Sequence, residues 1–428
     1  MFTLKIYQII TNIIRPLFFI FFNIRLLKNK EERGYFNVRK GISEIKRPSW
    51  RLIWIHAASV GEALSSLPLI DRLINSTSNY NIWLTTGTKT SKDLILKRNL
   101  KGVIHQYLPW DSIKYCNNFL DHWRPEISIF IESEIWPNHL HQIKKRKIPI
   151  LLINARITEK TKNKWLNFKK TIKYLLSHFS IIISQDNISK KRLEELGGKN
   201  ILMYGNLKHD SESLPFDSGI FNEFEKYSSE KNILVASSTH EGEEEKILEM
   251  FKILLSKMPN LFLVLAPRHP DRRNVVIHKI KKAGFLDSNF VLRSSSLKFD
   301  KKVNILILDT IGELGYFYEK ANSVILGGAF ERLGGHNPIE PARLSNAIFT
   351  GANFYNFENE FNNLINCNGA KVIKNYNDIE VMKDNRAIEE MALNSKKYSD
   401  SLGGAADKIV LKIEGLLNEN SWTKILVE

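Results

Sequence analysis

Cysteine is scarce in this chain of 428 residues, which contains only Cys116 and Cys367. Two cysteines cannot build the disulfide framework of a small secreted domain or a cysteine-rich metal cluster, and they favour a reducing compartment. The sequence also lacks a G-x-x-x-x-G-K-[ST] loop, an H-E-x-x-H pair and a paired C-x-x-C. These absences exclude a P-loop nucleotidase and argue against a zinc site, so we expect no metal and no cofactor.

An uninterrupted apolar run of the roughly 20 residues that a membrane span needs is also missing. The nearest candidate is Ile6–Ile24, which Arg15 and Pro16 interrupt, and no small-x-small cleavage site of a signal peptide follows it. Basic residues flank it: Lys5, Arg25, Lys28, Lys30 and Arg33. We expect residues 1–30 to be a membrane-associating segment on the cytoplasmic face, with a soluble packing helix as the alternative.

Negative charge is in deficit, with 46 Asp and Glu against 62 Lys and Arg and a formal net charge of +16. This balance favours an anionic partner such as nucleic acid, acidic lipid or a phosphorylated substrate. The lysines are scattered and form no dedicated arm, which argues against nucleic-acid binding. A Lys-rich genome composition is the alternative explanation of the charge.

Short apolar runs alternate with longer amphipathic stretches from residue 50 onward. The runs are 51–57, 81–86, 127–132, 148–154, 181–185, 232–236, 261–266, 304–308 and 323–326. Helical stretches such as 63–74 and 242–255 lie between them. This alternation predicts an α/β fold with parallel sheets that are covered by helices on both faces.

The strand–helix series occurs twice, and a chain of this length suits two domains. We therefore predict two doubly wound, Rossmann-like domains that face each other across a cleft. The predicted bounds are 31–208 for the first domain, 209–230 for a polar linker, and 231–428 for the second domain with its C-terminal helix. In such sheets ligands bind beyond the carboxyl ends of the strands, so the loops that follow strands should carry the function.

Two loops of the first domain carry candidate acids. Ser59 and Glu62 have the spacing of a capping box, which needs no catalysis. A carboxylate at this place can also take a proton from a hydroxyl, and the helix N-terminus should favour its ionised form while making it a weaker base. The loop Glu132–Asn138 follows another apolar run, and alternation along a strand would point Glu132 and Glu134 to the same side.

Two loops of the second domain have the features of an anion site. Pro267, Arg268 and His269 end an apolar run, and arginine matches phosphate geometry with two parallel hydrogen bonds. Gly327–Phe330 and Gly334–Pro341 are rich in glycine, which allows a close backbone approach to a ligand. In the latter segment we expect Asn337 to cap a helix that begins at Pro338, with Glu340 placed to accept hydrogen bonds from a ribose. Two weaker strand-end segments are Ser237–Glu243, which includes Ser238, and Asp309–Leu314.

Together these loops resemble those of the 3-deoxy-D-manno-octulosonic acid (Kdo) transferases, lipid A Kdo transferases that invert configuration and have the two-domain GT-B fold. The resemblance covers nearly the whole chain and rests on an ordered set of motifs. They are His56–Glu62, Thr85–Thr88, Tyr107–Asp111, Glu132–Asn138, Asn154–Arg156, Gly205–Lys208, Pro267–His269 and Gly334–Pro341. One departure is Ser133, where the pattern has threonine.

The resemblance implies a role for each matching residue. Glu62 is similar to the proton acceptor of the family, and Glu132 and Lys208 to residues that support the transition state. The segments that would bind cytidine monophosphate (CMP) are Pro267 and Arg268; Ile311, Gly312 and Glu313; and Asn337, Pro338, Ile339 and Glu340. Additional candidates are Ser59, Glu134, Ser238, His269 and Gly335. The implied reaction moves Kdo from CMP-Kdo to the lipid A precursor lipid IVA, in lipopolysaccharide core biosynthesis at the cytoplasmic face of the bacterial inner membrane.

Other functions account for parts of the sequence. A transferase of the same fold that uses a UDP-sugar is the nearest, and binding assays with CMP and UDP separate the two. In a non-catalytic lipopolysaccharide-binding protein, Glu62 would only cap a helix. A hydrolase built on Ser59 and His56 lacks an assignable third residue. Nucleic-acid binding explains the charge but neither the acidic loops nor the glycine-rich ones.

Overall fold

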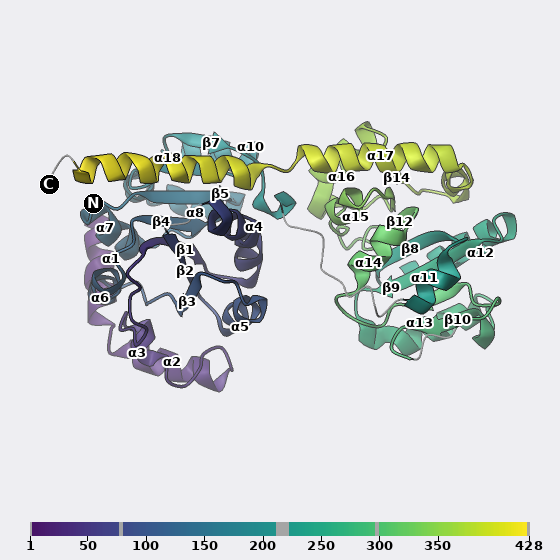
Figure 1. The fold of residues 1–428 in the computed structure, drawn as a ribbon, viewed down its shortest axis with the longest axis horizontal. Coiled ribbons are helices and arrows are strands. Elements are labelled where there is room, and N and C mark those ends of the chain that lie inside the picture. Colours follow the sequence, from purple (N-terminus) through teal and green to yellow (C-terminus); the bar gives the residue numbers. More distant parts are fainter. Residues whose placement is uncertain (1, 77–79, 211–221, 296–298, 426–428) are drawn as a thin grey trace. The chain divides into compact units, whose positions relative to one another are not determined.

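The computed structural model describes residues 2–76, 80–210, 222–295 and 299–425. The chain folds as two compact units. Unit 1 comprises Met1–Ser211 together with Leu402–Glu428, and unit 2 comprises Glu212–Ser401. Each unit has its own parallel sheet between layers of helices (Figure 1).

Unit 1 is built on a seven-stranded sheet with the order β3-β2-β1-β4-β5-β6-β7. Its strands are β1 (Arg51–Ala57), β2 (Tyr80–Thr86), β3 (Val103–Tyr107), β4 (Ile127–Ile131), β5 (Ile150–Ala155), β6 (Ile181–Ser184) and β7 (Ile201–Met203). All neighbouring strands pair in parallel. The connections are mainly helical, as parallel strands require.

The helices of unit 1 come from both ends of the chain. They are α1 (Phe2–Ile13), α2 (Leu17–Leu27), α3 (Phe36–Arg39), α4 (Val60–Ser76), α5 (Lys89–Arg98), α6 (Ile113–Trp123), α7 (Pro137–Lys145), α8 (Glu159–Leu166), α9 (Lys169–Leu176), α10 (Asn187–Glu195), the 3₁₀ helix η1 (Leu207–Asp210) and α18 (Ala405–Ile425). Alternate residues of β1 bury on opposite faces of the sheet. Ile53 and Ile55 pack with α4 and α18, whereas Leu52 and Trp54 pack with α6, α7 and α9.

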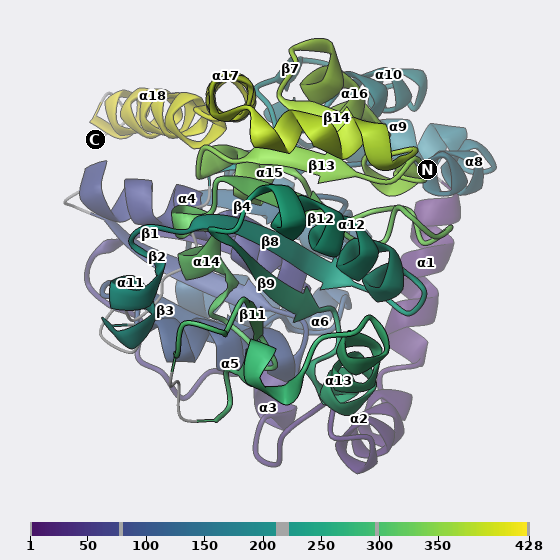
Figure 2. The ribbon, with the colours of Figure 1, turned by 90° about the vertical axis from the view of Figure 1, so that its right-hand side faces the viewer.

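Unit 2 repeats this architecture with the strand order β10-β11-β9-β8-β12-β13-β14. Its strands are β8 (Asn232–Thr239), β9 (Leu261–Pro267), β10 (Phe290–Leu292), β11 (Ile305–Ile307), β12 (Ser323–Leu326), β13 (Ala347–Thr350) and β14 (Ala370–Val372). The pairs are again parallel. Figure 2 shows β8, β9, β12 and β13 of this sheet together with helix α12.

Helices cover both faces of the second sheet as well. They are α11 (Asn222–Ser228), α12 (Glu243–Lys257), α13 (Arg273–Lys282), α14 (Leu314–Lys320), α15 (Ile339–Arg343), α16 (Glu358–Asn366) and α17 (Asn385–Ser401), with 3₁₀ helices η3 (Pro270–Arg272), η4 (Asp287–Asn289), η5 (Tyr355–Phe357) and η6 (Tyr376–Lys383). On β8, Leu234 and Ala236 pack with α12 and α13, whereas Ile233 and Val235 pack with α14 and α16.

Each sheet has one place where the strand order reverses direction. In unit 1 it lies between β1 and β4, and in unit 2 between β8 and β12. Loops that leave such a pair of strands turn to opposite faces, which opens a crevice at the carboxyl ends. Glu62 and Glu132 follow β1 and β4, while His240 and Gly327 follow β8 and β12. Some of the predicted functional loops of each unit therefore leave strands that flank a reversal point, whereas Lys208, Arg268 and Ile311 follow other strands.

The last helix, α18, belongs to unit 1 and not to the second domain, where the sequence analysis placed it. Its apolar face, which includes Ala405, Ile409 and Ile413, is buried in the core of unit 1. The Asp210 carboxylate accepts hydrogen bonds from the backbone N–H groups of Gly404 and Ala406 at 2.5 and 2.6 Å, which satisfies the start of this helix. An amphipathic pattern predicts a buried face without saying which sheet buries it.

Parts of the predicted linker, 209–230, belong to helices. Its first two residues complete η1 of unit 1. Its later part forms α11, whose Phe224 is fully buried against the sheet of unit 2. Residues 211–221 lie outside the described residues.

The N-terminal segment forms two helices, α1 and α2, with a bend of 72° between them. In the part of the chain that the structure describes, no single helix is long and apolar enough to cross a bilayer, although this bent pair passes that test when taken together. Helix α1 is fastened to unit 1, because Leu4 is 4% exposed and the Tyr7 hydroxyl donates to Asp111 at 2.8 Å. Helix α2 buries Phe22 against Trp110.

The other faces of these two helices are apolar and exposed. The exposed large side chains are Phe2, Ile6, Ile9, Ile10 and Ile13 of α1 and Leu17, Phe19, Ile20, Phe21, Ile24 and Leu27 of α2. Beyond α2, Lys28, Lys30 and Arg33 are also exposed. The segment thus has features of both alternatives. One side packs on the protein, as expected of a packing helix, and the other presents the apolar surface expected of a membrane-associating segment.

Candidate functional site

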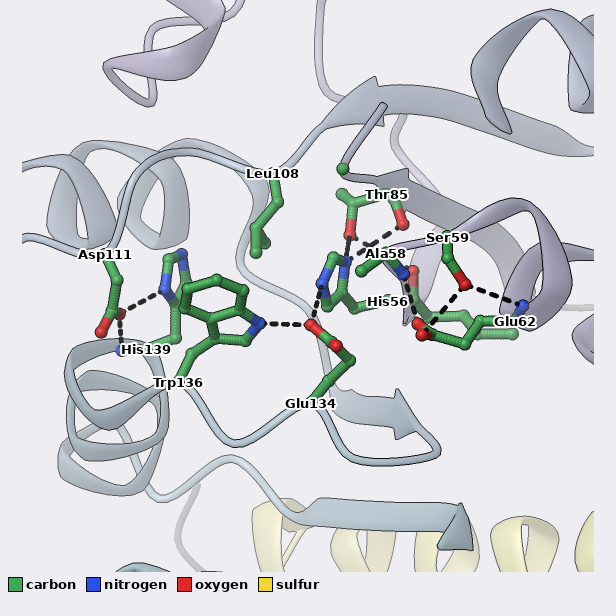
Figure 3. A network of polar contacts seen from close by, with 12 residues as sticks. His56, Ala58, Ser59, Glu62, Thr85, Leu108, Asp111, Glu134, Trp136 and His139 are labelled. Carbon is green, nitrogen blue, oxygen red and sulfur yellow. Dashed lines mark hydrogen bonds and ion pairs between the residues drawn. The ribbon is translucent and has the colours of Figure 1, made fainter. Parts of the chain in front are cut away.

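Glu62 lies in the first turn of α4, directly after β1 (Figure 3). Its carboxylate accepts a hydrogen bond from the backbone N–H of Ala58 at 2.7 Å and from the Ser59 hydroxyl at 3.1 Å. The Glu62 N–H donates in return to Ser59 Oγ at 3.3 Å. The Glu62 N–H bond to Ser59 is one half of the predicted capping box, whereas the Glu62 carboxylate binds the N–H of Ala58 in place of that of Ser59. Together these bonds fix the carboxylate at the carboxyl end of the sheet.

The same carboxylate is half-buried, and this burial raises its pKa; the nearby negative charge of Glu134 raises it further. The hydrogen bonds from Ala58 and Ser59 oppose the shift without cancelling it. The prediction that the helix N-terminus would make Glu62 a weaker base was wrong, because desolvation outweighs the helix-end interactions. A carboxylate with a raised pKa is a stronger base.

Glu134 and His56 form a hydrogen-bonded pair next to Glu62 (Figure 3). The His56 Nε2 and Glu134 Oε2 atoms are 3.3 Å apart, and Trp136 Nε1 donates to the same oxygen at 2.6 Å. Burial raises the pKa of Glu134, but the hydrogen bond and charge of His56 outweigh burial, and the net shift is downward. Glu134 is therefore held ionised beside a second carboxylate that is easier to protonate.

The other nitrogen of His56 faces Thr85. His56 Nδ1 lies 2.9 Å from Thr85 Oγ1 and 3.1 Å from the Thr85 carbonyl oxygen. The Ser59 hydroxyl donates to Glu62 and not to His56. The residues that a Ser59–His56 hydrolase would need are thus engaged elsewhere, which argues against that alternative.

Glu132 and Lys208 meet beyond the ends of β4 and β7. The Lys208 ammonium donates to Glu132 Oε1 at 3.0 Å. Glu132 has a φ of +61°, which is unfavourable for a residue with a side chain and recurs at functional sites. Asn154, with a φ of +54°, accepts the Leu207 N–H at 3.0 Å and so holds η1, which carries Lys208.

In unit 2, one buried carboxylate organises the loops after β8 and β12. Glu243 is fully buried in the first turn of α12. It accepts the N–H groups of His240, Gly328 and Phe330 at 2.9, 2.8 and 3.0 Å. A Cβ atom on Gly327 would lie 2.5 Å from the Ser238 carbonyl oxygen, so only glycine allows this approach. Ser238 has a φ of +54° at this contact.

Arg268 and His269 follow β9 and are both exposed, whereas Pro267 is the buried last residue of that strand. Among the residues that the structure describes, the Arg268 guanidinium has no hydrogen-bond or ion-pair partner. Arg272 differs, because it pairs with the fully buried Glu244 at 2.6 Å. Arg268 is therefore available to an anionic ligand, and Arg272 is not.

Ile311, Gly312 and Glu313 form the loop between β11 and α14. Ile311 is 87% exposed, and Gly312 has a φ of +92°. Glu313 accepts from Arg293 Nη2 at 2.6 Å and from the Thr310 hydroxyl at 2.5 Å. The loop thus presents the apolar side chain of Ile311 to solvent, while the Glu313 carboxylate is held by Arg293 and Thr310.

The segment that contains Asn337 and Glu340 forms a short helix, α15, which begins at Ile339. Its N-cap is the buried Pro338, one residue later than the predicted Asn337. The Asn337 side chain still accepts the Ile339 N–H at 3.0 Å. The Glu340 side chain is in contact with solvent on one side and with protein on the other. The loss of water on the protein side raises its pKa.

Gly335 joins this segment to the loop after β12. Its N–H donates to the Gly328 carbonyl oxygen at 2.8 Å, and its φ is +76°. The predicted donor-site residues thus lie at the carboxyl ends of β8, β9, β11 and β12, with Ser238 and Pro267 inside the strands and the others in the loops or the short helix beyond them.

Comparison with known proteins identifies the family. The family model described as 3-Deoxy-D-manno-octulosonic-acid transferase (kdotransferase) matches residues 29–211. A 3-deoxy-D-manno-octulosonic acid transferase of Haemophilus influenzae is 32% identical over 412 residues, which cover 95% of this chain and 94% of that protein. The chain belongs to the Kdo transferase family. It is therefore a glycosyltransferase, as the resemblance of its loops implied.

More distant relatives agree. A probable mitochondrial 3-deoxy-D-manno-octulosonic acid transferase of Arabidopsis thaliana is 28% identical over 98% of this chain and 95% of its own length. Among solved structures, the UDP-GlcNAc 2-epimerase of Neisseria meningitidis bound to UDP-GlcNAc matches with a TM-score of 0.59 at 12% identity. It covers 85% of this chain and 100% of that one. At this identity the likeness concerns the fold alone, which is the predicted GT-B fold.

Sequence reasoning did not single out three features of this Kdo transferase. His56 was noted as part of a motif but not as the partner of Glu134. Glu243 appears in the sequence analysis only as the end of a weaker strand-end segment, although it binds backbone N–H groups of the loop after β12. The contact between His240 and His336 joins residues that are 96 positions apart, and no spacing rule predicts it. For Glu243, the sequence does contain a signal, because a loop with Gly327 and Gly328 needs a partner that fixes its backbone, and Glu243 is that partner.

Proposed function

We propose that this protein moves Kdo from CMP-Kdo to the lipid A precursor lipid IVA, in lipopolysaccharide core biosynthesis. Glu62 takes the proton of an acceptor hydroxyl, and the hydroxyl oxygen attacks the anomeric carbon of Kdo. The bond between that carbon and the phosphate oxygen breaks, CMP leaves, and the new glycosidic bond has inverted configuration. One base and stabilisation of one leaving phosphate suffice for this direct displacement.

The observation that carries the proposal is the position of Glu62. Its carboxylate is fixed by two hydrogen bonds at the end of β1, and burial together with Glu134 raises its pKa. If Glu62 only capped a helix, its own hydrogen bonds would be enough. The neighbouring contact between Glu134 and His56 would then have no role in the cap. The arrangement suits a carboxylate that accepts a proton during the reaction.

The donor end of the reaction is assigned to unit 2. Arg268 carries an unpaired guanidinium in the described part of the chain, and Glu340 offers a carboxylate to the ribose hydroxyls. Ile311 is exposed on the adjacent loop, where it can pack against the cytosine ring. Glu132 and Lys208 are assigned to support of the transition state, because Lys208 places a positive charge at the strand ends of unit 1.

The surface of α1 and α2 supports the proposed lipid acceptor and the proposed location. Their exposed apolar side chains lie next to the exposed Lys28, Lys30 and Arg33. An apolar face beside basic residues suits the surface of a membrane that contains anionic lipid. We assign the protein to the cytoplasmic face of the inner membrane, where a lipid acceptor would be reached.

A single incubation tests the proposal. Purified protein is mixed with CMP-Kdo and lipid IVA, and the lipid product is read by mass spectrometry. We expect the mass of lipid IVA to rise by one or more Kdo residues, with CMP released. A parallel incubation with UDP-sugars should give no product. Transfer from a UDP-sugar, or binding of UDP in preference to CMP, would instead place the chain with the UDP-dependent transferases of this fold.

A further inference from the structure

Two histidines from different strand-end loops of unit 2 meet directly. His240 follows β8 and His336 follows the glycines after β12. Their Nε2 atoms lie 2.9 Å apart, and the two rings are within 2° of parallel. Both side chains are half-buried. We call these two residues the histidine pair.

The histidine pair rests on a rigid support. Glu243 binds the His240 N–H and the Gly328 N–H with the same oxygen, Oε2. Gly328 in turn accepts the N–H of Gly335, the residue before His336. One buried carboxylate therefore fixes the backbone on both sides of the contact, and the pair is not a chance approach of two surface side chains.

The contact sets what the pair can offer a ligand. When both rings are neutral, one Nε2 donates its hydrogen to the other, so one Nδ1 is an acceptor and the other is a donor. Adding one proton gives both rings an Nδ1–H. Within the described ranges, neither Nδ1 atom has a hydrogen-bond partner in the protein. The singly protonated pair thus offers two donors and one positive charge.

We propose that the histidine pair binds the carboxylate of the donor sugar and takes up one proton from solvent when the donor binds. This inference rests on the proposed function. CMP-Kdo carries two anionic groups, a phosphodiester and the carboxylate of the ulosonic acid. Arg268 is a permanent cation for the phosphate, while Arg272 is neutralised by Glu244. The proton on the pair supplies the second positive charge, and a nucleotide whose sugar carries no carboxylate gains nothing from it.

Neighbouring charges set the direction of the pH dependence. The groups that face His240 are Glu243, His269, Arg272 and Glu244, and those that face His336 are His240 and Arg268. Burial lowers the pKa of both histidines, and that of His336 falls to about 4, with His240 and Arg268 adding to the shift. Without ligand the pair is neutral at pH 7. A bound carboxylate favours the protonated form, so affinity for CMP-Kdo should fall as the pH rises.

The test compares two affinities in the same variants. KM for CMP-Kdo and the Kd for CMP are measured for the wild type, His240→Gln and His336→Gln. His278→Gln, an exposed histidine on α13, is the matched control. We expect each pair variant to raise KM for CMP-Kdo about 10- to 100-fold, the effect of losing a charged hydrogen bond, with little change in Kd for CMP. Calorimetry in buffers of different ionisation enthalpy should show proton uptake with CMP-Kdo and not with CMP.

The outcomes separate the inference from the function it rests on. An equal loss of CMP and CMP-Kdo binding would mean that the pair serves the nucleotide phosphate, which overturns the carboxylate assignment. Unchanged KM in both variants, or no proton uptake by the wild type, overturns it too. A wild type that transfers no Kdo from CMP-Kdo would reject the proposed function itself. Unchanged CMP binding shows that a variant is folded, and either histidine alone suffices for the test.

Discussion

At the scale of single residues, Glu62 is the first to test. Glu62→Gln keeps an oxygen for the capping box but cannot accept the proton, so the rate should fall about 10²- to 10⁴-fold while CMP still binds. The matched control is Glu159→Gln, which changes a first-turn acid of another capped helix in unit 1. Both variants should melt close to the wild type. Near-normal turnover of Glu62→Gln would reduce this residue to a helix cap.

Glu134 should act through the pKa of Glu62. Burial and the charge of Glu134 hold that pKa above the ordinary value, so kcat/KM should fall as the pH drops through the raised pKa. Glu134→Gln removes one cause of the rise and should move the acid limb of the pH profile to lower pH. Glu126→Gln is the control, because Glu126 precedes β4 whereas Glu134 follows it. An acid limb that stays in place would show that Glu134 only anchors Trp136 and His56.

The two arginines after β9 should behave differently. Arg268→Ala, and likewise Glu340→Ala, should weaken CMP binding by about 1.5–3 kcal/mol, because each removes a charged partner of the ligand. Arg272→Ala should instead lower stability, since it deprives the buried Glu244 of an ion-pair partner. Calorimetry with CMP and thermal melting distinguish the two effects. CMP affinity that is unchanged in both Arg268→Ala and Glu340→Ala would place the nucleotide elsewhere.

At the scale of elements, the N-terminal helices combine two roles that substitutions on their exposed and buried sides can separate. Replacing Phe19, Ile20 and Ile24 of α2 together with serine should leave the fold intact, because they are 56%, 56% and 46% exposed. The variant should sediment less with vesicles that contain anionic lipid. Tyr7→Phe should do the reverse, keeping vesicle binding and losing about 1.5–3 kcal/mol of stability with its bond to Asp111. If the triple serine variant binds vesicles as the wild type does, another surface holds the membrane.

The elements also show how far the sequence leads. The longer strands, such as β1, β4 and β9, follow from apolar runs that end in polar or glycine-rich loops. Strands β7, β10 and β14 have three residues each. A segment this short shows no hydrophobic pattern that would distinguish it from a loop. The loops were assigned correctly to strand ends, but the contacts among them are tertiary. The meeting of His56 with Glu134, or of Glu243 with Gly328, depends on the strand order.

At the scale of the whole molecule, the chain enters unit 2 once and returns to unit 1 for its last helix. Truncation after Gly404 should therefore damage unit 1, although the cut lies at the other end of the chain. It removes the buried Ile409 and Ile413, and the loss of these two side chains alone is comparable with the stability of a domain. We expect the truncated protein to lose the cooperative transition of unit 1, while residues 212–401 still melt cooperatively and bind CMP. Intact cooperative unfolding of both units would show that α18 is dispensable.

The return of α18 to unit 1 also governs the order of events during synthesis. The sheet of unit 1 is made first, but the helix that covers Ile53 and Ile55 is translated only after the whole of unit 2, about 190 residues later. At an elongation rate of roughly 5–20 residues per second, α18 becomes available to pack on this apolar surface about 10–40 seconds after unit 1 is otherwise complete. Unit 2 is continuous in sequence and can fold on the ribosome in the meantime. The nascent chain therefore spends this interval with a sheet face that α4 covers only in part and with two apolar N-terminal helices already made, and it is then most exposed to chaperones and to aggregation.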